Sequence, residues 1–196
     1  MPRLFVAIEL PAAAKQSLAR LCSGPRSVRW ARPDTLHLTL RFIGEVDDAA
    51  ATRIDAALGR IEAAPFWLTL AGVGEFRGHT LWAGVEFCPA LMDLQSAIER
   101  QLQEIGLLAD ARPFQPHIKL GRSRRRRSFR DFLAEHAGFR AAPFEVAQFS
   151  LFESRLGRNG AVHERRATYP LSSIGHAPSR RPWLSRLASL LRLVRP

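Results

Sequence analysis

Cysteine is scarce in this sequence. Cys22 and Cys88 are the only two among 196 residues, and they stand far apart without a CxxC pair. A small secreted domain held by disulfides and a structural zinc site built on thiolates both need more cysteines than this. Both classes are therefore excluded, and we expect the two cysteines to be small core residues.

Long apolar runs are missing as well. No window offers the roughly 18 uninterrupted apolar residues that a membrane-spanning helix requires. The opening segment is apolar, but Glu9 and Pro11 interrupt it too early for the apolar region of a signal peptide. We therefore expect a cytoplasmic protein.

The sequence does contain enough apolar material for a core. It is 46% hydrophobic and 24% charged, which is typical of a folded chain. Its length predicts one compact domain, which we place at residues 1–173. Residues 174–196 have the pattern of a basic amphipathic helix after a linker. We expect this tail to dock on its own domain, with a partner or an anionic membrane surface as the alternatives.

Positive charge is concentrated in two places. The net charge is +11, yet residues 119–130 hold seven basic and no acidic residues, and residues 176–196 hold five and none. A polyanionic partner is therefore a candidate. The arginine run at 124–127, with Arg122 and Arg130, is expected to contact an RNA backbone, and a solvated loop is the alternative.

Hydrophobic periodicity predicts an α+β fold with antiparallel sheets. The order of elements in the first half loosely recurs in the second, which predicts a two-lobed, pseudo-duplicated fold. Strands are expected at residues 4–10, 35–42, 66–73, 80–87, 117–120, 144–153 and 161–171, and helices after Pro11 and at residues 47–63, 91–105 and 129–136.

Two short segments carry the chemistry, His37-Leu38-Thr39-Leu40 and His117-Ile118-Lys119-Leu120. Residues i and i+2 of a strand share a face, so each segment presents an imidazole and a second polar group to one side. Two opposed histidines suit the cleavage of a phosphodiester, because a neutral imidazole accepts a proton while a protonated one donates one. Thr39, Lys119 and a nearby arginine can stabilise charge on the phosphoryl oxygens, without a metal.

The sequence resembles the 2H phosphoesterases, and within them the bacterial and archaeal RNA 2′,3′-cyclic phosphodiesterases, also called 2′-5′ RNA ligases. The resemblance runs from about Arg3 to Leu171. It rests on RLFVAIELP, WARPDTLHLTLRFIGE, GVGEF, LWAGVE, FQPHIKLGR and LFESRLGRNG.

The resemblance implies two lobes whose sheets face a central cleft, with helices outside. It implies that His37 and His117 activate water and protonate the leaving ribose oxygen, and that Thr39 and Arg122 bind phosphate. The expected reaction opens an RNA 2′,3′-cyclic phosphate to a 2′-phosphomonoester without metal or cofactor, and some relatives join RNA ends through a 2′-5′ bond.

Lys119 departs from the family pattern, which usually has threonine there. A lysine can replace the hydroxyl with a point charge that binds phosphate and disfavours protonation of His117, which would make His117 the base. The alternative is that Lys119 extends to solvent and the site works with one threonine.

For the remaining aromatic and histidine residues we expect ordinary positions in the fold. Trp30, Trp67, Trp82 and Phe42 are expected in the core. His79, His136, His163 and His176 lack metal-ligand spacing, and most of them are expected at the surface or in turns.

Two other functions stay open. A small cyclic nucleotide or an ADP-ribose cyclic phosphate would be served by the same two histidines, and a catalytically weakened RNA-binding module fits Lys119 and the arginine run. In each case we expect a monomer.

Overall fold

The computed structural model describes residues 1–126, 128–157 and 160–172. The predicted tail helix and Arg127 therefore lie outside the described residues. Within these ranges no helix is both long and apolar enough to cross a membrane.

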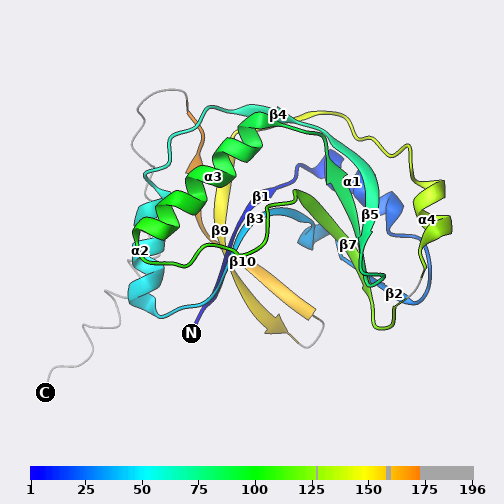
Figure 1. Ribbon diagram of the computed structural model, residues 1–196, viewed down its shortest axis with the longest axis horizontal. Coiled ribbons are helices and arrows are strands. Elements are labelled where there is room, and N and C mark those ends of the chain that lie inside the picture. Colours follow the sequence, from blue (N-terminus) through cyan, green and yellow to red (C-terminus); the bar gives the residue numbers. More distant parts are fainter. Residues whose placement is uncertain (127, 158–159, 173–196) are drawn as a thin grey trace, which may run out of the picture.

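The first sheet has four antiparallel strands in the order β10-β9-β1-β3 (Figure 1). One of its faces is packed in the main core. Alternate residues of β1 and β3, namely Leu4, Val6 and Ile8 and then Leu38 and Leu40, are almost fully buried there. The strands are β1 (Arg3–Glu9), β3 (His37–Glu45), β9 (Gln148–Gly157) and β10 (Gly160–Pro170). Strand β3 is an edge of this sheet, and it contacts β7 of the second sheet.

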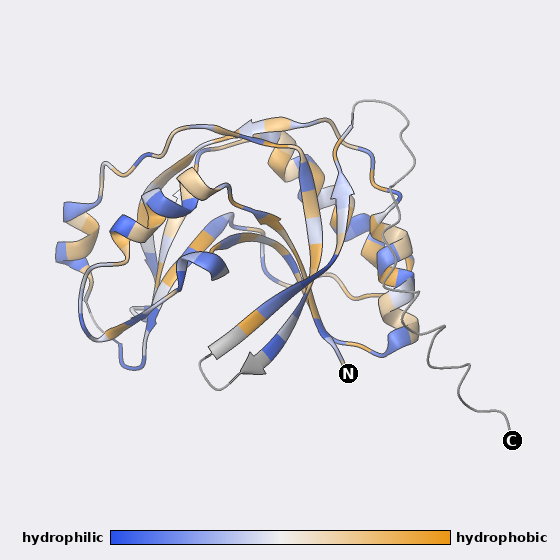
Figure 2. Ribbon diagram, turned by 180° about the vertical axis from the view of Figure 1, so that it is seen from behind, coloured by the Kyte–Doolittle hydropathy of each residue, from blue (hydrophilic) through white to orange (hydrophobic). Residues whose placement is uncertain are grey.

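The second sheet is also antiparallel, in the order β2-β7-β6-β5. Its strands are β2 (Val28–Trp30), β5 (Leu70–Phe76), β6 (Thr80–Val85) and β7 (His117–Ser123). A separate two-stranded ladder joins β4 (Phe66–Leu68) to β8 (Phe144–Val146). Hydrophilic and hydrophobic residues are mixed along the strands in Figure 2. The start of β3 alternates as expected for a sheet with one face in the core, whereas β1 is buried on both faces from Leu4 to Ile8.

Four helices flank the sheets. Helices α2 (Asp48–Leu58) and α3 (Pro89–Glu104) contact each other, and α3 also contacts β3. Helices α1 (Ala12–Leu21) and α4 (Arg130–Glu135) lie at the other end of the molecule in Figure 1. Local sequence explains α2 directly, because the Asp47 carboxylate accepts a hydrogen bond of 2.6 Å from the Ala50 amide and so caps the helix.

The predicted repetition is present. A strand, a helix, a motif strand and a helix occur in this order as β1, α1, β3 and α2, with the short β2 and a 3₁₀ turn before β3, and again as β6, α3, β7 and α4. The α+β class with antiparallel sheets is therefore confirmed.

Several expectations about single elements need correction. The strand expected from residue 35 begins at His37, because Pro33–Thr35 forms a 3₁₀ turn. The core assignment of Trp67 is wrong: its side chain is 66% exposed, since Phe66 and Leu68 take the buried face of the short strand β4. Trp30 and Trp82 are half-buried, and so are Cys22 and Cys88, which pack against the core as free thiols.

Gly121 of β7 is predicted to be intolerant of a side chain. A Cβ placed there would lie 2.5 Å from Val28 Cγ1 and 3.1 Å from the Arg29 carbonyl oxygen. We expect Gly121→Ala to lower the free energy of unfolding by about 1–3 kcal/mol, measured by urea denaturation. Gly138→Ala is the matched control, because nothing lies within 4 Å of a Cβ at that position. Equal midpoints for the two variants would contradict the prediction.

Candidate active site

His37 is the first residue of β3, directly after the 3₁₀ turn. This turn places the Thr35 carbonyl oxygen 2.7 Å from His37 Nδ1. A carbonyl oxygen can only accept, so the proton of the neutral ring is on Nδ1 and Nε2 carries the free lone pair. The ring also packs against Phe5 of β1, with centroids 5.0 Å apart. His37 is thus held in one tautomer with a proton-accepting nitrogen.

His117 is held in the same way at the start of β7. Its Nδ1 lies 2.8 Å from the carbonyl oxygen of Gln115, again two residues earlier in the chain. The Phe76 ring packs on it at 4.9 Å, in an edge-to-face arrangement. Each motif histidine therefore has one phenylalanine neighbour, one backbone acceptor and an unused Nε2.

The two motif strands share a backbone irregularity. In β3 the ladder with β1 passes from Thr39 to Arg41 and skips Leu40. In β7 the ladder with β6 passes from Lys119 to Gly121 and skips Leu120. A β-bulge thus follows the third residue of each motif, and it turns two successive residues to the buried side.

The bulges decide which side chains join the histidines. Leu40 and Arg41 are both buried, as are Leu120 and Gly121, so the next residues, Phe42 and Arg122, return to the histidine faces. This overturns the expected core position of Phe42, whose side chain is 56% exposed. It also places Arg122 on the same strand face as His117 and Lys119.

A third histidine, His163 of β10, contacts the first. Its ring centroid is 5.2 Å from that of His37 and 4.9 Å from that of Phe5, both edge-to-face. Strands β9 and β1 separate β10 from β3, and each strand spacing is about 4.8 Å, so this contact requires the sheet to curl. A bulge at Arg166 of β10 adds local twist. His163 is therefore an exception to the surface or turn positions that were expected for most of these histidines.

Residue patterns contain only part of the information that places His163 beside His37. Alternation in β10 places it on one face with Arg165, whose side chain forms a 2.7 Å ion pair with Glu9, the cross-strand partner of His37. The curl of the sheet, which brings this face over His37, depends on tertiary packing and has no local pattern.

Positive charge surrounds these histidines. Burial lowers the pKa of His37 to about 4, although the hydrogen bond with Thr35 acts in the opposite direction. The charges of His163, Lys119 and Lys15 lower this pKa further. Burial likewise lowers the pKa of His163, again with a contribution from Lys119. His37 is therefore neutral at pH 7.

Lys119 acts across the two sheets. It stands on β7 beside His117, and its charge lowers the pKa of His37 on β3. Burial and the Arg122 charge lower the pKa of Lys119 itself. From the sequence we expected the lysine to favour His117 as the base by acting on that neighbour. The charge instead favours a neutral His37, and its expected effect on His117 stays a prediction.

The cations on this face have few counter-charges. Among the described residues, no ion pair involves Lys119, Arg122 or residues 124–126. Near His163, the charge of Asp34 opposes those of Lys119 and Arg32. Arg122 is also the cross-strand partner of Arg29. An anion is the natural counter-charge for such a surface. In the part of the chain that is described, no group of three or more His, Cys, Asp or Glu side chains could hold a metal ion.

Comparison with known proteins identifies the class. The model of the 2′-5′ RNA ligase superfamily matches residues 11–158. The RNA 2′,3′-cyclic phosphodiesterase of Escherichia coli K12 is 32% identical over 161 residues, which cover 80% of this chain and 89% of that protein. The enzyme of the same name from Archaeoglobus fulgidus is 28% identical over 170 residues, which cover 83% and 96%.

Solved structures agree. The crystal structure of E. coli LigT complexed with 3′-AMP matches with a TM-score of 0.77 and 30% identity, over 88% of this chain and 99% of that one. The chain is thus a two-sheet protein with paired histidine motifs, and it belongs to the 2′-5′ RNA ligase superfamily.

The low pKa of His37 predicts a pH-dependent stability. The unfolded imidazole takes up a proton near pH 6.5, whereas the folded one resists protonation down to about pH 4. Stability is therefore complete above pH 6.5 and falls as the pH drops to 4, by about 3 kcal/mol from this residue.

Urea denaturation of the wild type and His37→Gln at pH 7 and pH 4 measures this contribution. We expect the variant to lose less free energy of unfolding between the two pH values. Equal losses in the two proteins would contradict the assignment of the effect to His37.

Proposed function

We propose that the protein hydrolyses RNA 2′,3′-cyclic phosphate ends to 2′-phosphomonoesters, with His37 and His117 as the two proton-transfer groups. The observation that carries this proposal is the matched geometry of the two rings. Both donate Nδ1–H to the carbonyl oxygen of the residue two positions earlier and leave Nε2 free. The names of the curated relatives support the substrate class.

The proton transfers follow from the electrostatics. His37, neutral because its pKa is lowered to about 4, accepts a proton from the attacking water at Nε2. The water oxygen bonds to phosphorus as the bond from phosphorus to the ribose 3′-oxygen breaks. His117 in its protonated form gives a proton to that leaving oxygen. The product has a 2′-phosphate and a free 3′-hydroxyl.

Three further side chains stabilise the charge that accumulates on phosphorus. The Thr39 hydroxyl stands on the His37 face of β3, and the Lys119 ammonium and Arg122 guanidinium stand on the His117 face of β7. Charged donors fixed at the site stabilise the doubly negative transition state more than the singly negative substrate. Metal and cofactor have no part in this proposal.

The same groups would also serve ligation. If a 5′-hydroxyl of a second RNA end takes the place of water, its proton passes to His37 and a 2′-5′ bond forms as the 3′-oxygen leaves. Whether water or a 5′-hydroxyl reacts depends on which one the bound RNA presents to His37.

The first test is hydrolysis of an RNA oligonucleotide with a 2′,3′-cyclic phosphate end, in the presence of EDTA. We expect the wild type to turn over, and His37→Ala and His117→Ala each to lose at least about a hundredfold in kcat. Mass spectrometry and phosphatase sensitivity locate the product phosphate. A folded wild type that binds this RNA without turnover, with binding that survives both substitutions, would favour an RNA-binding module.

The second test concerns Lys119. If Lys119 binds phosphate, Lys119→Ala should raise KM for the cyclic-phosphate RNA, since it removes a cation from the site. Lys119→Thr should retain activity, because the hydroxyl still donates a hydrogen bond. Unchanged kinetics in both variants would mean that Lys119 does not contact the substrate.

A substrate panel separates the remaining alternative. Nucleoside 2′,3′-cyclic monophosphates and an ADP-ribose cyclic phosphate are compared with the oligonucleotide by kcat/KM. The cations at residues 122 and 124–126 favour the oligonucleotide, because it adds further phosphates beyond the reacting one.

A further inference from the structure

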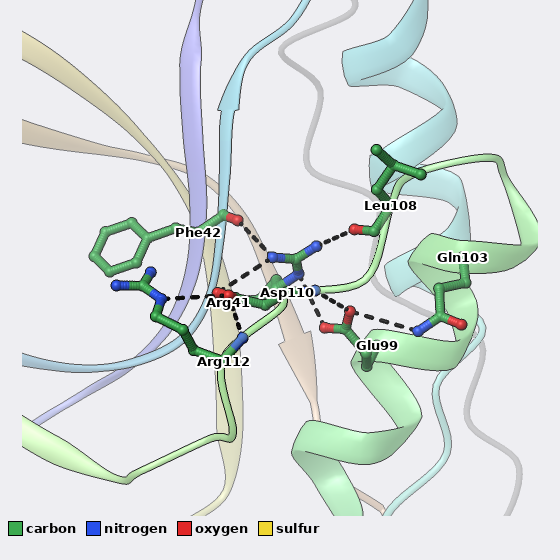
Figure 3. A network of polar contacts seen from close by, with 7 residues as sticks. All are labelled: Arg41, Phe42, Glu99, Gln103, Leu108, Asp110 and Arg112. Carbon is green, nitrogen blue, oxygen red and sulfur yellow. Dashed lines mark hydrogen bonds and ion pairs between the residues drawn. The ribbon is translucent and has the colours of Figure 1, made fainter.

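Arg41 is a charged side chain inside the protein. It follows Thr39 in the bulged part of β3, and only 9% of its side chain is exposed. Figure 3 shows its guanidinium surrounded by oxygen atoms. It lies 2.9 Å from the Glu99 carboxylate and 3.5 Å from that of Asp110, and it donates hydrogen bonds to the carbonyl oxygens of Leu108 and, at 3.2 Å, Phe42.

Three of these four partners belong to one stretch of chain. Glu99 is on α3, and Leu108 and Asp110 are in the connection that leads from α3 to β7. This stretch is also bound to itself: Glu99 accepts a 3.1 Å hydrogen bond from the Asp110 amide, and Asp110 accepts one of the same length from the Arg112 amide. The pKa of Asp110 is lowered, first by that amide and also by the Arg41 charge.

The second motif shows that a bulge does not need an arginine. The residue of β7 that corresponds to Arg41 is Gly121, which fills its place with backbone alone, against Val28 and Trp30. Arg41 is therefore not needed to form the bulge, and its role follows from the groups that it contacts. A buried ion pair is weak evidence for stability, because desolvation offsets the attraction, and its best-attested use is to fix one arrangement.

The arrangement in question includes both histidines. Arg41 is four residues after His37, and Asp110 is seven residues before His117. We propose that Arg41 is a positioning residue, which fixes the placement of His117 relative to His37 by holding residues 108–110 against β3. Only one part of this proposal rests on the proposed function, namely that the placement of His117 relative to His37 sets the rate of hydrolysis.

Arg41→Met tests the proposal, because it keeps the length of the side chain and removes its charge and donors. The Glu99 carboxylate then remains without its cation, whereas Asp110 keeps its 3.5 Å ion pair with Arg112. Arg41→Met/Glu99→Gln is therefore made alongside it to limit unfolding. Circular dichroism selects a temperature at which every variant is folded. Arg140→Met is the matched control, because Arg140 also pairs with a carboxylate, that of Glu86, and is largely exposed.

Kinetics with adenosine 2′,3′-cyclic monophosphate give the first result. We expect kcat to fall by at least about tenfold, since small displacements of reacting groups reduce rates strongly. We expect KM to change by less than about threefold, because ground-state contacts with phosphate are kept. Arg41→Lys should recover part of the loss, and the control should match the wild type.

Hydrogen–deuterium exchange gives a result that does not depend on activity. Amides in residues 107–120 should exchange faster in both Arg41→Met variants, whereas those of β1 should not change. Unchanged exchange in residues 107–120 would overturn the proposal, even if the wild type proves inactive and the proposed function fails. Faster exchange with a wild-type kcat would also overturn it, because Arg41 would then hold the segment without positioning the site.

Discussion

The bulge after the third residue of each motif is the constraint on which the site depends. A regular strand alternates its faces without interruption, so one extra residue exchanges the faces for everything that follows. In β3 this sends Arg41 into the protein and returns Phe42 to the His37 face. In β7 it sends Gly121 inward and returns Arg122 to the His117 face. Lys119 and Arg122, the proposed phosphate-binding groups, lie on one surface only because of this exchange.

Much of the fold and the motif chemistry could be predicted from residue patterns. Alternation correctly placed His37 with Thr39 and His117 with Lys119, because these pairs precede the bulges. The same rule failed beyond them, where Phe42 was assigned to the core. The bulge has no clear signature in either segment, since HLTLRF and HIKLGR have little in common after the fourth residue. His163 was missed for a different reason, because its contact with His37 depends on the curl of a four-stranded sheet.

Electrostatics ties the two sheets into one site. The groups whose charges lower the pKa of His37 come from different elements: Lys119 from β7, Lys15 from α1 and His163 from β10. The low pKa of His37, which burial causes first and these charges increase, is therefore a property of the assembled fold, and neither motif could produce it alone. A bound anion would supply negative charge and ease protonation of His37.

The position of β3 has a consequence for solubility. This strand is an edge of its sheet, and β7 and α3 contact it without extending its ladder. Exposed edges invite pairing with strands of other molecules, and natural sheets oppose this with bulges and with charges that point inward. Strand β3 has two irregularities in its ladder and the buried charge of Arg41. The features that place side chains at the candidate site therefore also make this edge strand a poor template for aggregation.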